Sequence, residues 1–319
     1  MPGSGLELVG EHLTEVYHYR PATPKAASHA IVLVPGNPGA VYFYMPFLES
    51  LGKSLGGRSS VHGFSFANHH LSRGDAEDDF TNSALGLEQQ IAHSAAFIDS
   101  VAHELPVNGT ITLIGHSIGA YIVLQIISRG PSIMARLAGV IHLMPFFRWS
   151  LLPLSHKAKL SLYAQAPSTV NALINVFFQR FKNLPLLTKT RLLQSSTSGA
   201  KGEVDVIAGR LLTERLLRNF AAMGLDEIHA VYRNELQVGR QLKLLDGCIP
   251  SLILVTDNDE WCPEEEVRVS KATLPHTEVL FVPNLTHSFS RSLHNADLVA
   301  TLVAKHIAKE NSSNPNSRL

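Results

Sequence analysis

The sequence has few cysteines, little charge and no long apolar run. Its two cysteines, Cys248 and Cys262, form no C-x-x-C or Cys-His ligand pattern, so neither a disulfide scaffold nor a zinc site is expected. No eighteen consecutive residues are all apolar, and the first twenty residues lack a basic segment followed by an apolar one. We therefore predict no membrane-spanning helix and no secretory signal, and we expect an intracellular, reducing location.

Charge of either sign is also scarce. The 27 basic and 27 acidic side chains cancel, and charged residues make up 17% of the chain. No overall field attracts nucleic acid, so no nucleic-acid partner is expected. Apolar residues make up 45% of the 319 residues, which is enough for a large core. α/β folds of this length often form one domain.

Strand patterns alternate with helical patterns along most of the chain. A continuous apolar run, which suits a strand buried on both faces, occupies residues 30–34, and further strand patterns rich in apolar residues occupy 137–144, 250–255 and 278–282. Apolar residues at helical spacing occur in 42–55, 85–105 and 291–309. This alternation predicts an α/β fold with a mostly parallel central sheet and helices on both faces.

Three segments outside this pattern are expected at the surface. Residues 14–20 alternate and predict an antiparallel edge strand. His69 and His70 lie in the polar stretch 67–85, beside an acidic run at 75–79. Neighbouring histidines on one loop rarely converge on one ion, so we interpret both as surface side chains and predict no metal site. The polar end of the chain, 311–319, is expected to be disordered.

The stretch 110–121, TITLIGHSIGAY, has the pattern of a nucleophile elbow. It begins as a β-branched strand, reads G-H-S-I-G in the middle and continues with helical apolar spacing. A strand that turns into a helix within a few residues projects the central side chain outward, and small residues two positions away prevent clashes. Ser117 is therefore the candidate nucleophile, flanked by Gly115 and Gly119. His116 is interpreted as a packing or hydrogen-bonding neighbour, because its ring is directed away from the serine hydroxyl.

A serine nucleophile needs a base and an orienting carboxylate, in the chain order Ser, Asp or Glu, His. His287 follows the strand pattern 278–282 and is the candidate base, whereas His276 and His294 fit surface roles. Asp257 and Asp259 both follow the strand pattern 250–255. We favour Asp259 as the acid and keep Asp257 as the alternative.

The negative oxygen that forms during acyl transfer needs two preorganised N–H donors. Ile118, at the start of the elbow helix, is expected to supply the first. The second is expected from the loop Pro-Gly-Asn-Pro-Gly after the strand 30–34. Pro38 has no N–H, so Asn37 is the expected donor and Gly39 the alternative; the competing interpretation is a simple tight turn.

Residues from about 146 to 245 interrupt the strand-helix alternation. They contain helical patterns broken by prolines at 153, 167 and 185 and show no strand pattern. Because strands of one sheet are expected on both sides, we interpret this segment as a helical cap inserted into a single domain spanning 1–319.

The cap has an unusual charge distribution. No Asp or Glu occurs between Glu104 and Glu203, whereas 149–164 and 170–193 combine bulky apolar residues with Lys and Arg. That combination suits a surface lying in a phospholipid monolayer with anionic headgroups. The alternative is a cap that packs its apolar face onto the catalytic core, and a lid over a lipid site can do both.

In combination, the motifs VPGNPG, GHSIGAY, DNDEWCP and NLTHSF resemble the lipid droplet-associated hydrolase family of α/β-hydrolases, from about residue 30 to 305. The acid loop departs from the family pattern by having Glu260 where a proline is typical. The resemblance implies a nucleophile at Ser117, an acid at Asp259 and a base at His287. It implies a serine esterase of neutral lipids or sterol esters, without a cofactor, at the cytoplasmic face of lipid droplets, with the endoplasmic reticulum as an alternative location.

Two other functions are compatible with the same motifs. One is a lipid-droplet binding or remodelling protein with little or no turnover, in which the cap carries the function. The other is acyl transfer to an acceptor other than water, which a Ser-His-Asp arrangement also supports. No obligate protein partner is inferred.

Overall fold

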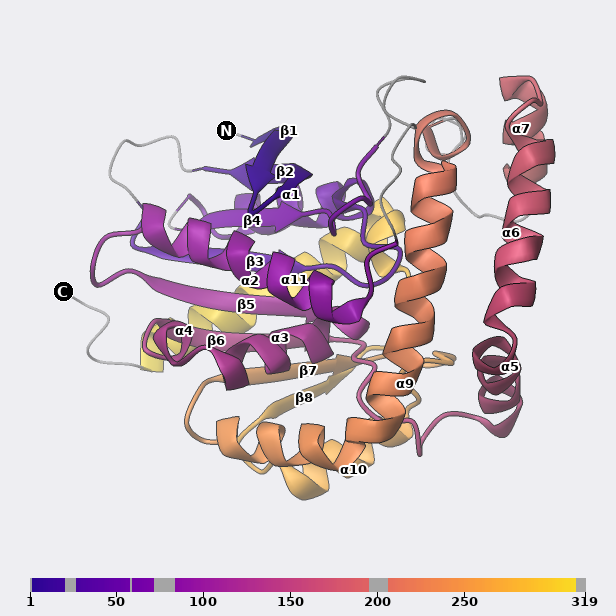
Figure 1. Ribbon diagram of the computed structural model, residues 1–319. Helices are drawn as coiled ribbons and strands as arrows, with labels where there is room; N and C mark the ends of the chain where they lie inside the picture. The colour runs from indigo at the N-terminus through magenta and orange to yellow at the C-terminus, as the bar shows by residue number, and fades with distance from the viewer. Residues whose placement is uncertain (1, 21–26, 58, 72–83, 195–205, 314–319) are drawn as a thin grey trace.

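The computed structural model describes residues 2–20, 27–57, 59–71, 84–194 and 206–313. Its sheet has eight strands in the order β1-β2-β4-β3-β5-β6-β7-β8 (Figure 1). Their bounds are β1 Pro2–Val9, β2 His12–Tyr19, β3 His29–Val34, β4 Ser60–Phe64, β5 Thr110–His116, β6 Leu137–Leu143, β7 Ser251–Val255 and β8 Glu278–Phe281. Only the pairs β1–β2 and β2–β4 are antiparallel within the described sheet, so the predicted mostly parallel sheet is confirmed.

The parallel strands end in register at one edge of the sheet. Val34 pairs with Gly115, Leu143 with Leu254 and Val255 with Phe281. The loops that follow β3, β5, β7 and β8 therefore begin side by side, which is where open α/β sheets bind ligands. The predicted nucleophile, acid, base and oxyanion loop all lie in these four loops.

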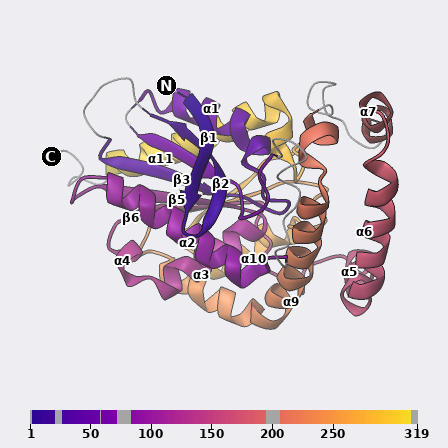
Figure 2. The ribbon, with the colours of Figure 1, turned by 45° about the horizontal axis from the view of Figure 1, so that its top comes forward.

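Helices cover both faces of the sheet (Figures 1 and 2). On one face α1 packs against α11, and on the other α2 packs against α3. The bounds are η1 Val41–Tyr44, α1 Met45–Ser54, α2 Leu87–Glu104, α3 Ile118–Arg129, α4 Pro131–Met134, α10 Glu265–Thr273, η4 Phe289–Arg291 and α11 Leu293–Ser313. Helix α3 is buried over most of its length, which explains its almost uninterrupted apolar sequence.

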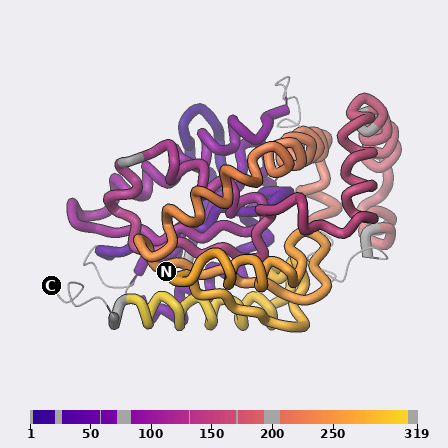
Figure 3. The backbone as a smooth tube through the Cα atoms, turned by 90° about the horizontal axis from the view of Figure 1, so that it is seen from below, coloured from indigo at the N-terminus to yellow at the C-terminus, as the bar shows by residue number. Residues whose placement is uncertain are grey.

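The described part of the chain between β6 and β7 is helical or irregular. It contains α5 Leu154–Gln165, α6 Pro167–Phe181, α7 Leu186–Gln194, η3 Ile207–Leu211 and α9 Glu214–Leu245, which we call the helical segment. Helix α9 stands at the strand-end edge of the sheet, and α5, α6 and α7 form a column on its outer side (Figures 1 and 3). Among the described helices, none is both long and apolar enough to cross a bilayer.

The predicted edge strand at 14–20 is wrong in its position. Strand β2 pairs with β4 on one side and with β1 on the other, so β1 is the edge. Residues 2–9 include Gly3 and Gly5, and glycine has a low strand propensity. The sequence of this segment therefore does not show a strand pattern, although pairing with β2 stabilises it as a strand.

The predicted surface location of His69 and His70 is also wrong, because both side chains are buried. Their loop packs behind the loop that follows β3, and His69 Nδ1 donates to the carbonyl oxygen of Pro38. The neighbouring acidic run at 75–79 lies outside the described residues. The predicted disordered segment, 311–319, begins too early, because α11 continues to Ser313.

Four buried histidines predict a stability that depends on pH. Burial lowers the pKa to about 3 for His62 and His142 and to about 4 for His69 and His93. The unfolded chain therefore binds more protons than the native state between pH ~6.5 and pH ~4. We expect the free energy of unfolding to be highest above pH ~6.5 and to fall as the pH drops through this window.

His142→Gln should reduce the slope of the unfolding free energy between pH 7 and pH 5 by up to about 1.4 kcal/mol per pH unit. The measurement is urea denaturation at a series of pH values. His294→Gln, at an exposed position in α11, is the matched control and should leave the slope unchanged. An identical slope for the wild type and His142→Gln would contradict this prediction.

Candidate active site

Ser117 lies at a sharp turn between β5 and α3. Its backbone has φ 54° and ψ −123°, a conformation that is strained for a residue with a side chain. A Cβ on Gly115 would lie 2.5 Å from Ala120 Cα, and one on Gly119 would lie 2.3 Å from the carbonyl oxygen of Val34. Both contacts are with backbone, which has little freedom to move away. The two flanking glycines are thus required where the elbow pattern predicts them.

The structure brings Ser117, His287 and Asp259 into one hydrogen-bonded row. Ser117 Oγ lies 2.9 Å from His287 Nε2, and His287 Nδ1 lies 2.6 Å from Asp259 Oδ2. With the proton on Nδ1, the ring donates to the carboxylate and Nε2 can accept the serine proton. The Asp259 side chain has no exposed surface, whereas that of His287 is 22% exposed, so of these two residues only the base retains access to solvent.

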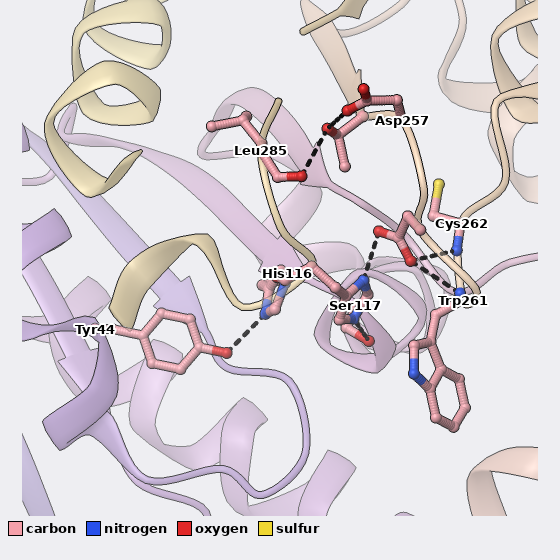
Figure 4. A network of polar contacts seen from close by, with 10 residues as sticks. Tyr44, His116, Ser117, Asp257, Trp261, Cys262 and Leu285 are labelled. Atoms are coloured by element: carbon pink, nitrogen blue, oxygen red, sulfur yellow. Dashed lines mark hydrogen bonds and ion pairs between the residues drawn. The ribbon is translucent and has the colours of Figure 1, made fainter. Parts of the chain in front are cut away.

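The two candidate carboxylates have different partners. Asp259 Oδ1 accepts from the backbone N–H groups of Trp261, at 2.8 Å, and Cys262, at 3.0 Å, which leaves Oδ2 directed at His287. Asp257 Oδ1 instead accepts from Asn284 N at 2.7 Å and from the Thr256 hydroxyl at 3.1 Å. Figure 4 shows Asp257 on the Leu285 side of the loop, apart from Ser117. The geometry therefore favours Asp259 as the partner of His287.

The loop after β3 runs directly beside the elbow. A Cβ on Gly36 would lie 2.9 Å from Ser117 Cβ, so only glycine permits this approach. The N–H of Gly39, the alternative donor, is already bonded to the Gly36 carbonyl oxygen at 2.7 Å. Within the described residues, the N–H groups of Asn37 and Ile118 donate to no protein acceptor. These two groups are therefore available to an incoming oxygen.

A buried hydrogen-bond chain connects this loop to the base. The N–H of Gly36 donates to the Tyr44 hydroxyl at 2.9 Å, and that hydroxyl lies 2.7 Å from His116 Nδ1. His116 Nε2 lies 3.0 Å from the carbonyl oxygen of His287. Burial, assisted by His287, holds the pKa of His116 well below its usual range. A neutral ring with its proton on Nε2 satisfies both contacts, so His116 has the hydrogen-bonding role expected from the sequence.

Aromatic and buried groups surround the acid loop. Trp261 stacks at a tilt 6.4 Å from the His287 ring, and His156 of α5 meets Trp261 edge-on at 4.7 Å. Cys262 is buried and is not in a disulfide. Burial and the nearby Asp259 carboxylate raise its thiol pKa well above the usual range. This thiol is therefore protonated and has no nucleophilic role.

Sequence reasoning missed two side chains beside the site, Tyr44 and Glu227. Tyr44 lies in η1 and has no distinguishing pattern, because its role depends on contacts distant in sequence. Glu227 had a detectable signal: it lies at helical spacing with Met223, Ile228 and Val231, on the apolar face of α9. An acid on such a face is a candidate functional group.

Comparison with known sequences gives one family. The model of the lipid-droplet associated hydrolase family matches residues 27–290. The human lipid droplet-associated hydrolase is 25% identical over 315 residues, covering 93% of this chain and 90% of the human protein. The Rattus norvegicus protein of the same name is 26% identical, covering 88% and 86%.

Solved structures show the same fold at low sequence identity. Haloalkane dehalogenase DbeA from Bradyrhizobium elkani superposes with a TM-score of 0.71 at 13% identity, covering 98% of this chain and all of that one. A thermophilic esterase from Thermogutta terrifontis gives 0.59 at 17% identity, covering 97% and 99%. The predicted α/β-hydrolase fold is thus confirmed, and the chain belongs to the lipid-droplet associated hydrolase family.

Proposed function

We propose that this hydrolase is a serine esterase that cleaves carboxylic esters of lipids through an acyl-enzyme on Ser117. The single observation that carries the proposal is the row from Ser117 through His287 to Asp259, with contacts of 2.9 Å and 2.6 Å. A hydroxyl nucleophile with a hydrogen-bonded imidazole and a buried carboxylate is the arrangement that acyl transfer requires. Neutral lipids and sterol esters are the substrate class that the family resemblance suggests.

The first half-reaction transfers the acyl group to the enzyme. Ser117 Oγ attacks the ester carbonyl carbon while His287 Nε2 takes the hydroxyl proton. Asp259 stabilises the resulting imidazolium through Nδ1. The carbonyl oxygen becomes negative and accepts from the N–H groups of Ile118 and Asn37. When the tetrahedral intermediate collapses, the carbon–oxygen bond to the alcohol breaks, and His287 returns its proton to the departing alcohol.

The second half-reaction frees the acid. A water molecule attacks the acyl carbonyl of Ser117 while His287 takes a proton from the water, and the same two N–H groups hold the negative oxygen. Collapse breaks the bond to Ser117 Oγ, which recovers the proton from His287. Another hydroxyl in place of water would give acyl transfer, the alternative that this geometry equally permits.

We further propose that α5, α6 and α7 contact the phospholipid monolayer of a lipid droplet. Large apolar side chains exposed on these helices are Leu154, Leu162, Leu173, Val176, Phe177, Leu186, Leu187 and Leu192. Their charged residues are all basic: Lys157, Lys159, Arg180, Lys189 and Arg191, with Lys182 just beyond α6. Exposed apolar surface with cations matches the acyl and anionic headgroup layers of a monolayer. The helices lie outside α9, so the site would face the droplet side.

Ser117→Ala removes the nucleophile and should abolish both fluorophosphonate labelling and hydrolysis of p-nitrophenyl butyrate. The expected loss of kcat is at least about a thousandfold, because serine, histidine and aspartate act as one unit. His287→Gln should come close to the same loss. Ser290→Ala, at another buried serine of the same region, controls for loss of a hydroxyl. Full labelling of Ser117→Ala would disprove the assignment of the nucleophile.

Asp259→Asn and Asp257→Asn form a matched pair that tests the acid. Asp259→Asn removes the carboxylate that orients His287, and a loss of kcat of about a thousandfold or more is expected. Asp257→Asn loses only a loop contact, and kcat should stay within about fivefold. The measurement is steady-state kinetics on the same ester. Equal losses from both variants would contradict the choice of Asp259.

Leu173→Asp with Phe177→Asp puts two charges on the exposed apolar face of α6. We expect droplet binding to weaken by at least about tenfold, because each buried apolar side chain contributes about 1.5–3 kcal/mol. Flotation with artificial droplets coated with anionic phospholipid measures this. Hydrolysis of p-nitrophenyl butyrate should be unchanged.

Leu236→Asp with Leu244→Asp is the matched control, because both leucines are exposed on α9 rather than on α5–α7. It should bind droplets like the wild type. Binding by the α6 variant at wild-type strength would show that these helices do not hold the monolayer. If the Ser117→Ala variant still remodelled droplets in cells and the α6 variant did not, the alternative function would be favoured, in which the protein binds droplets with little turnover.

A further inference from the structure

We infer that Glu227 is a positioning residue for the second oxyanion donor: from helix α9 it holds the side chain of Asn37 and thereby ties the helical segment to the catalytic loop. The inference rests on the proposed esterase function, in which the Asn37 N–H receives the negative oxygen. Glu227 itself touches no reacting atom.

The contacts of Asn37 define this connection. Its side-chain Nδ2 donates to the Phe220 carbonyl oxygen at 3.2 Å and to Glu227 Oε1 at 3.4 Å. Both partners belong to α9, two turns apart on the same side. The loop after β3 is therefore held by α9 at Asn37, the residue whose backbone N–H is proposed as the second oxyanion donor. On its other side the same loop is held within the core, through Gly36 to Tyr44 and through Pro38 to His69.

Helix α9 approaches the loop closely. A Cβ on Gly224 would already touch Asn37 Nδ2 and the Tyr163 hydroxyl, each at 3.6 Å, so a longer side chain would separate them. Tyr163 of α5 donates its hydroxyl to the Ala221 carbonyl oxygen at 2.7 Å. The contact region thus joins α5, α9 and the catalytic loop around one carboxyl group.

The carboxyl group of Glu227 is uncharged near neutral pH. Burial raises its pKa to about 8, and the hydrogen bond from Asn37 opposes that shift only partly. Tyr163, the titratable group that the structure places beside it from α5, is also neutral, because burial and then Glu227 raise its pKa to about 12. A protonated carboxyl has an O–H to donate. Within the described residues, Asn37 Oδ1 is buried without a hydrogen-bond partner, so a suitable acceptor lies on the same side chain.

A double-mutant cycle tests the coupling. Glu227→Leu removes the polar contact and Asn37→Ala removes its partner, while the Asn37 position keeps its backbone N–H. Each single change should lower kcat on p-nitrophenyl butyrate about tenfold with KM within about twofold, and the double variant should be no slower than the slower single variant. Additive losses, or a kcat for Glu227→Leu within twofold of the wild type, would overturn the inference.

Glu227→Gln separates positioning from packing. It keeps the shape and the hydrogen-bonding groups, so kcat at pH 7 should stay within about threefold of the wild type, but it cannot titrate. Because the native pKa of Glu227 lies above that of an unfolded Glu, the stability that this group contributes to the wild type is lost as the pH rises from ~5 to ~8. The Tm of the wild type relative to Glu227→Gln should fall across this window. A Tm difference independent of pH would contradict the buried neutral carboxyl.

Two controls keep this inference distinct from the esterase proposal. Glu214→Gln changes a surface glutamate of the same helix, paired with Arg218, and should alter neither kcat nor the pH dependence of Tm. If Ser117→Ala retained activity, the esterase proposal would fail, while the Tm values of the single and double variants would still measure the Glu227–Asn37 coupling. Additive changes in Tm would then overturn the coupling on their own.

Discussion

The strained backbone at Ser117 is the constraint on which the site depends. A residue with a side chain at φ 54° costs on the order of 1–3 kcal/mol, so the surrounding structure must hold it. Two backbone hydrogen bonds do so: Ser117 N donates to the Leu143 carbonyl oxygen at 3.0 Å, and Phe146 N donates to that of Ser117 at 3.2 Å. Both come from the end of β6 and its following loop. The nucleophile is therefore held by the neighbouring strand, and its hydroxyl is presented at the edge where the other loops begin.

Much of this arrangement could be predicted because parallel strands buried on both faces have distinctive sequences. The strands β3, β6 and β7 are rich in apolar residues, and the loops that follow β3 and β7 contain the predicted oxyanion donor and the predicted acid. The predictions failed where the structure depends on contacts distant in sequence. β1 contains glycines and is a strand because β2 pairs with it. His69 and His70 are polar in the sequence, yet packing behind the Pro38 loop buries them.

The choice between Asp257 and Asp259 shows what sequence cannot resolve locally. Both follow β7 within four residues and differ little in surroundings along the chain. Between them Asn258 has φ 54°, a left-handed conformation that Asn tolerates, so the chain reverses and sends the two carboxylates in different directions. Asp259 then receives two backbone N–H groups on one oxygen and His287 on the other. Which carboxylate meets the base is decided by this turn, and the residue types alone do not specify it.

The loop after β3 is the part of the site most dependent on its surroundings, because it is held from two independent sides. Tyr44 and His69 fix it to the core, whereas Phe220 and Glu227 fix Asn37 to α9. The core contacts belong to a densely buried region and keep the glycine-rich backbone beside Ser117. The α9 contacts belong to the helix against which α5 and α6 pack. On the functions proposed for these elements, a change in how the outer helices lie on lipid would reach the oxyanion donor at Asn37 before it reached Ser117, His287 or Asp259.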